Sequence, residues 1–204
     1  MITFDRLKVV LQKVRQIQEH QKMMCLAGDR IPVSIEDLQY VVSDMYGFAK
    51  IEKFDVAFAA DFTRGMLERY KNKTAKIYIR KDQSDDWKRY IAAKELCHLV
   101  IDEPEDFSPD GHSTIQHLIA TKIPTKNNGD EQSNDVDSEW LAEFAAREIL
   151  YPYPMRKSDI DLLKSNKHTQ TSLAVHYEIP EYAIGVVLQE HYMTGVGAVW
   201  EELP

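Results

Sequence analysis

Cysteine and long apolar runs are both scarce in this chain. Its 204 residues include two cysteines, Cys25 and Cys97, and one pair cannot form a disulfide framework, which favours free thiols in a reducing compartment. Apolar runs such as "YAIGVVL" at 182–188 fall far short of the ~20 residues that span a bilayer. Charged residues within positions 5–8 also interrupt the apolar stretch that a signal peptide needs. We therefore expect a cytoplasmic protein without membrane contact.

Several functional motifs are absent as well. The sequence contains neither G-x-x-x-x-G-K-[ST] nor G-x-G-x-x-G, and no serine or cysteine lies in a local nucleophile motif, which argues against kinases, dehydrogenases and serine hydrolases. The 33 acidic and 25 basic residues give a formal charge of −8, which repels nucleic acid and anionic membranes. Basic clusters at 69–76 and 155–168 also contain or adjoin polar and acidic residues, so we interpret them as solvated surface. No direct binding of nucleic acid is expected.

Periodicity and turn signals predict an α+β fold in which helices dominate. Ser34, with Asp37 three residues later, is typical of a helix start, and Gly47 of its end. Two runs rich in β-formers predict a small antiparallel sheet of about three strands beside the helix at 86–101. The segment 103–137 is rich in turn formers and predicts an exposed loop with a short helix. The expected helices are 3–26, 35–47, 86–101, 138–150, 158–166, 170–177 and 181–193, and the expected strands include 56–62 and 75–81.

We expect three parts along the chain. These are an N-terminal amphipathic helix (1–28), a central domain (29–155) and a C-terminal helical subdomain (156–204), with a tail after position 193. Asp85 or Asp86 is expected to cap the helix at 86–101.

The segment "KELCH" at 94–98 differs by one residue from the zinc-protease motif H-E-x-x-H. In that motif, two histidines one helical turn apart bind zinc and the glutamate activates its water. Helical spacing allows Lys94, Glu95 and His98 to address one point in space. A glutamate and a histidine three residues apart are common on helix surfaces, so the surrounding sequence decides the interpretation.

Three separated segments resemble the ImmA/IrrE family of metallo-endopeptidase-like proteins. They are "KRYIAAKELCH" at 88–98, "EWLAEFAAREILYP" at 139–152 and "SLAVHYEIPEYAIGVVL" at 172–188, and the resemblance covers about residues 30–190. It implies a zincin-like fold with zinc as cofactor, His98 and Glu139 as metal ligands and Glu95 as general base. It also implies a regulatory role, with a protein partner such as a transcriptional repressor or a peptide substrate.

Lys94 stands where the resemblance places the other histidine ligand. A catalytic zinc needs three protein ligands and a water, and a lysine ammonium has no lone pair to donate. Neighbouring carboxylates raise the lysine pKa and keep it charged. One hypothesis is that the ammonium replaces the charge of the metal by pairing with Glu139, Glu95 or both. The alternative is that Lys94 extends to solvent and the site is vestigial.

These observations favour a metallopeptidase-like regulatory pseudoenzyme with a degenerate zinc site that binds a protein partner. One alternative is an active zinc endopeptidase in which His112, His117 or a water takes the place of the missing histidine. Cys97 points away from the motif and is expected to pack in the core. Another alternative is a DNA-binding regulator that uses 181–191 as a recognition helix. The base-reading face of that segment has no lysine or arginine, so a structural helical pair is favoured.

Overall fold

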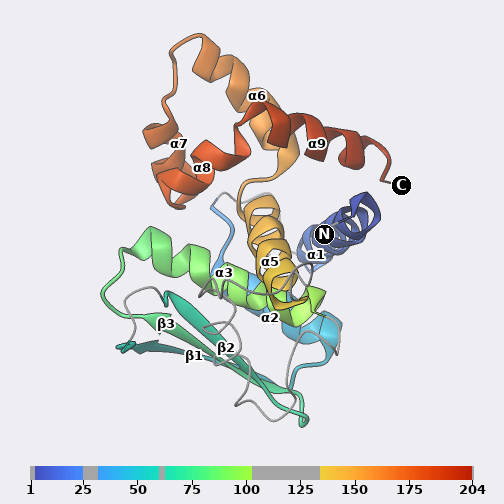
Figure 1. Ribbon diagram of the computed structural model, residues 1–204, viewed down its shortest axis with the longest axis vertical. Coiled ribbons are helices and arrows are strands. Elements are labelled where there is room, and N and C mark those ends of the chain that lie inside the picture. The colour runs from blue at the N-terminus through green and yellow to red at the C-terminus, as the bar shows by residue number, and fades with distance from the viewer. Residues whose placement is uncertain (1–2, 25–31, 60–62, 103–133, 204) are drawn as a thin grey trace, which may run out of the picture.

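The computed structural model describes residues 3–24, 32–59, 63–102 and 134–203 (Figure 1). In that part of the chain the protein is a mostly helical α+β structure with eight helices and one three-stranded sheet. The elements are α1 (Phe4–Met23), α2 (Ile35–Tyr46), β1 (Lys50–Val56), β2 (Gly65–Arg69), β3 (Thr74–Arg80), α3 (Asp85–Ile101), α5 (Asn134–Leu150), α6 (Tyr153–Lys164), α7 (Gln170–Tyr177), α8 (Glu181–Val187) and α9 (Glu190–Glu201). Within these ranges, every helix is too short or too polar to cross a membrane.

The sheet is mixed, so the prediction of an antiparallel sheet is wrong. The strand order is β1-β3-β2, in which β1 runs parallel to β3 and β2 antiparallel to it. The strand expected at 75–81 is β3, but the one expected at 56–62 lies earlier, at β1. Charged residues dominate β1, as is common for an edge strand, and they hide its strand character in the sequence.

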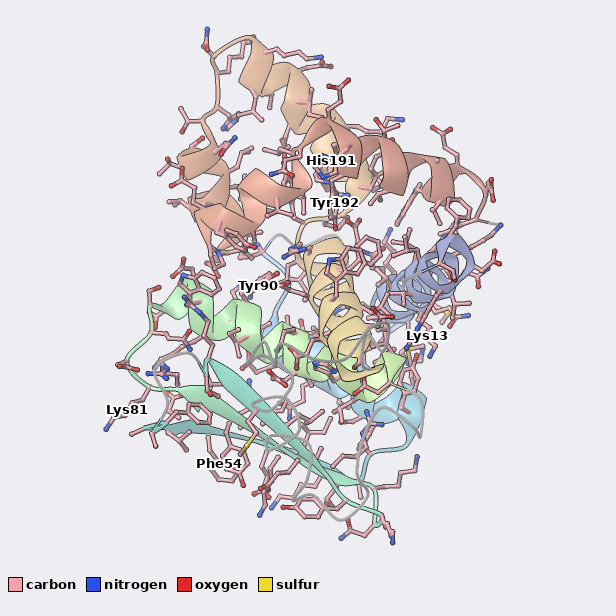
Figure 2. The ribbon with its side chains drawn as sticks, in the orientation of Figure 1. Lys13, Phe54, Lys81, Tyr90, His191 and Tyr192 are labelled. Carbon is pink, nitrogen blue, oxygen red and sulfur yellow. The ribbon has the colours of Figure 1, made fainter. Side chains whose placement is uncertain are left out.

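The inner face of the sheet packs against α3. Along β3, burial alternates with period two, and Ala75, Ile77 and Ile79 are buried, as expected for a strand with one covered face. On the outer face, Phe54 and Tyr78 stack with ring centroids 5.5 Å apart. Figure 2 shows Phe54 on the side of the sheet that faces away from the helices. Side-chain alternation thus fixes which face of the sheet supports the motif helix.

Helix boundaries follow local capping chemistry. The Ser34 side chain accepts a hydrogen bond from the Asp37 backbone N–H (3.2 Å), and Gly47 ends α2 with φ of 69°, which confirms the predicted limits. The expectation that Asp85 or Asp86 caps the motif helix is wrong, because Ser84 is the N-cap residue. Both aspartates lie in the first turn, where they interact favourably with the helix dipole.

Four helices form the C-terminal part, above α3 and α5 in Figure 1. The single helix expected at 181–193 is two helices, α8 and α9, and the expected tail is most of α9. Glycine lowers helix propensity, and α9 contains two glycines, Gly195 and Gly197. Gly197 packs so closely on Tyr153 that an added Cβ would lie 2.5 Å from the tyrosine Oη. Tertiary packing explains the helix better than propensity does.

Buried polar contacts join the C-terminal helices to the rest. Arg156 of α6 and Glu148 of α5 are both fully buried, and Arg156 Nη2 lies 2.9 Å from each Glu148 carboxylate oxygen. Tyr192 of α9 donates a hydrogen bond to the same carboxylate (2.9 Å), and Figure 2 shows its side chain close to α5. These contacts fix α6 and α9 relative to α5.

Candidate functional site

The motif helix α3 is enclosed along most of its length. From Tyr90 to Ile101, every residue except Lys94 is buried, because α3 lies between the sheet, α2 and α5. In Figure 1, α5 crosses the C-terminal half of α3. This crossing brings Glu139, near the start of α5, to the residues of the "KELCH" segment.

Lys94 forms ion pairs with both predicted carboxylates. Its Nζ lies 2.8 Å from Glu139 Oε2, to which it donates a hydrogen bond, and 3.1 Å from Glu95 Oε1. The Lys94 side chain is only 12% exposed. The hypothesis that Lys94 pairs with Glu139, Glu95 or both is therefore confirmed, and the alternative of a lysine extended to solvent is wrong.

His98 lies between two carboxylates. Its Nδ1 is 3.0 Å and 3.1 Å from the two oxygens of Asp102. Its Nε2 is 3.4 Å from Glu139 Oε1, close enough for an ion pair but not aligned for a hydrogen bond. Ser138 donates a hydrogen bond to Asp102 Oδ1 (2.7 Å). Lys94, Glu95, His98, Asp102 and Glu139 form one connected group, called here the Lys94 cluster.

Asp102 and Ser138 were missed by the sequence analysis. Asp102 is four residues after His98, the spacing at which helical side chains meet, so this contact could be predicted from the sequence. Ser138 has no such local signal, because its contact with Asp102 depends on how α5 crosses α3. The first residue was predictable and the second was not.

The pKa values follow from the competition between burial and charge. Burial alone would lower the pKa of Lys94, but Glu95 and Glu139 outweigh it and hold that pKa above its ordinary value. Burial would likewise lower the pKa of His98, but Asp102 and Glu139 raise it to about 10. For Glu139, burial favours a higher pKa, and Lys94 together with His98 holds it well below its usual range. At neutral pH the cluster therefore contains two cations beside its carboxylates.

The strand β2 approaches the cluster at Gly65. A Cβ added there would lie 2.8 Å from Glu95 Oε1 and would also collide with Ile91. Arg69, at the other end of β2, donates a hydrogen bond to the backbone carbonyl of His98 (2.5 Å). The absence of a side chain at position 65 is what allows β2 to lie directly against α3.

The residues present do not fit a catalytic zinc. His98 Nε2 and a carboxylate of Glu139 could each donate a lone pair. The Lys94 ammonium, however, lies 2.8 Å from that carboxylate, at the position that the resemblance assigns to the third ligand. Two protein ligands are too few for a stable catalytic site. Among the residues that the structure describes, no three histidine, cysteine, aspartate or glutamate side chains are grouped to hold a metal ion.

The remaining candidates fall outside this cluster. His112 and His117 lie outside the described residues. Cys97 is 2% exposed and burial raises the pKa of its thiol, so its predicted place in the core is confirmed. In α8, Tyr182 is 57% exposed and its ring stacks on Trp87 of α3 with centroids 6.3 Å apart, which ties this helix to the motif helix.

Comparison with known proteins gives no family for this chain: no protein-family model matches it, and no curated protein matches it either.

Proposed function

We propose that this protein is an ImmA/IrrE-type metallopeptidase-like regulatory protein that has lost zinc hydrolysis and acts by binding a protein partner. The observation that carries the proposal is the Lys94 ammonium, paired at 2.8 Å with Glu139 and at 3.1 Å with Glu95. The pairing occupies the carboxylates that the resemblance assigns to metal binding and water activation. By that resemblance, the partner is a protein such as a transcriptional repressor.

Charge balance supports replacement of the metal by side chains. Lys94 and a protonated His98 together contribute two positive charges, the charge of one zinc ion. Three carboxylates, those of Glu95, Glu139 and Asp102, surround these two cations. Buried carboxylates without cations would be strongly destabilising. The cluster can therefore keep α3 and α5 packed together without a metal.

The sheet edge beside the cluster supports recognition of a peptide. Among the described strands, β2 pairs only with β3 and is an edge strand, and edge strands are where a segment of another protein can add as a further strand. At Gly65, one face of this strand packs against Glu95 of the cluster. An extended segment of a partner protein could be held here through backbone hydrogen bonds without being cleaved.

A cleavage assay tests the loss of hydrolysis. Casein would be incubated with the natural protein and with Glu95→Gln, each with added zinc and with a chelator. We expect the same background in all four reactions, because the cluster supplies only two metal ligands, too few to hold a catalytic zinc. Cleavage that requires both zinc and Glu95 would overturn the proposal and support the active endopeptidase with an atypical ligand.

A further inference from the structure

A groove lies on the face of α3 that points away from the Lys94 cluster. It has a volume of about 810 Å³ and is bounded by the N-terminal half of α3, the start of α2, β1, the end of β3, and α7 with α8. Figure 1 shows α7 and α8 beside the N-terminal end of α3. The groove uses Asp85, Arg89 and Ala92 of α3, whereas the cluster uses positions 94, 95, 98 and 102. It is therefore a separate surface.

The accessible lining of the groove is mostly apolar. Ile79 of β3, Ala92 of α3 and Ile179, in the turn between α7 and α8, line it. Val175 of α7 also lines it and is 75% exposed, a high value for a large aliphatic side chain. Ile79, Ala92 and Ile179 are already buried in the protein, so an apolar side chain of a ligand would chiefly remove the surface of Val175 from water, at about 25 cal/mol for each Å² buried.

The rim of the groove carries an excess of negative charge. It contains six carboxylates and three cations, and each cation already has a carboxylate partner. Lys53 pairs with Glu36 at 2.8 Å, and Lys88 with Asp55 at 2.6 Å. Arg89 lies 3.9 Å from Glu178.

Three rim carboxylates remain, on Asp85, Asp86 and Glu181. Among the described residues, none of the three is paired with a cation, and only Glu181 has a side-chain hydrogen bond, which Thr171 donates (3.0 Å). A ligand that fills the groove would therefore meet an apolar floor and a net charge of −3 on the rim.

We propose that this groove binds a segment of a partner protein that carries lysine or arginine beside apolar side chains. Charge complementarity selects a basic ligand, and the apolar floor selects one with aliphatic or aromatic groups as well. The volume lies within the usual range for a binding pocket, about 300 to 1,000 Å³. Nucleic acid and anionic cofactors do not match the rim. The inference does not depend on the absence of zinc chemistry, because it uses other residues.

The test is fluorescence anisotropy with two labelled probes, a helical amphipathic peptide of leucine and lysine and its analogue of leucine and glutamate. Only the lysine peptide is expected to bind, with an affinity that falls as salt is added. The variant Asp85→Asn/Asp86→Asn/Glu181→Gln should bind it about tenfold more weakly, because three exposed ion pairs of ordinary strength change a binding constant by roughly that factor. Val175→Asn should also weaken binding, since it removes the exposed apolar wall.

A matched control separates this groove from the overall charge of the protein. Asp5→Asn/Asp161→Asn/Glu190→Gln removes the same charge from exposed positions outside the groove, two of them in first helical turns, and should bind the lysine peptide unchanged. Equal weakening in both triple variants would overturn the proposal, as would tight binding of the glutamate peptide or no binding of either probe. A dimer in sedimentation experiments that dissociates in the groove variant alone would assign the groove to a second copy of the chain instead.

Discussion

Replacement of Lys94 by methionine tests whether its ammonium stabilises the fold. Methionine keeps a flexible side chain of similar length, but Glu95, which is 3% exposed, would lose its cation. Breaking a buried ion pair by removal of one partner costs about 3 to 5 kcal/mol. Because the Glu139 side chain is 29% exposed, we expect the lower end, about 3 kcal/mol of unfolding free energy at neutral pH.

The loss should depend on pH in a defined direction. Lys94 and His98 hold the pKa of Glu139 below its ordinary value of 4.5, so this carboxylate stabilises the native protein above that pH and loses its contribution as the pH falls. The difference between the natural protein and Lys94→Met should therefore be largest at neutral pH and shrink in acid.

A matched control lies on the same helix. Lys88 forms a short ion pair with Asp55 (2.6 Å), but the two side chains are 24% and 54% exposed, and Lys88→Met should cost no more than about 1 kcal/mol. Urea unfolding followed by far-ultraviolet circular dichroism measures both variants. If Lys94→Met were no more destabilising than Lys88→Met, the charge-replacement argument would be refuted.

Three further changes test the surroundings of the cluster. Gly65→Ala should destabilise the protein by about 1 to 3 kcal/mol through overpacking against α3, whereas Gly195→Ala, with open space around its Cβ, should be neutral or stabilising in the same unfolding assay. Asp102→Asn should lower the pKa of His98 from about 10 towards 6.5, which NMR titration would measure. The protonated His98 stabilises the native protein below about pH 6.5, and this stabilisation is lost as the pH rises towards 10, so the variant should show a smaller effect. An unchanged pKa would contradict the assigned role of the Asp102 carboxylate. Arg156→Met should cost about 3 to 5 kcal/mol, because its fully buried carboxylate partner would be unpaired, and a loss below 1 kcal/mol would show that this pair is not needed.

Local chemistry made much of the fold predictable. The cap at Ser34, the left-handed Gly47 and the buried run of α3 all act within a few residues, so the sequence alone indicated the helices. The helical spacing of positions 94, 95 and 98 likewise predicted that these side chains share one site. The contact with Glu139 required the family resemblance, because it joins two helices across a long stretch of chain.

The errors occurred where packing overrides local preference. Strand composition does not reveal strand direction, so the parallel pairing of β1 with β3 could not be read from the sequence. The boundary between α8 and α9 falls at Leu188 and Gln189 without a glycine or proline to mark it. The position of Ser138 beside Asp102 depends on the crossing of two helices, and no sequence spacing reports that crossing.

Zinc content tests the central claim most directly. Elemental mass spectrometry would be applied to untagged protein purified without chelator, to Lys94→His and to Lys94→His/Glu139→Ala. The account predicts no zinc in the natural protein, near-stoichiometric zinc in Lys94→His, and its loss when Glu139 is also removed. Stoichiometric zinc in the natural protein would contradict the replacement of the metal by Lys94.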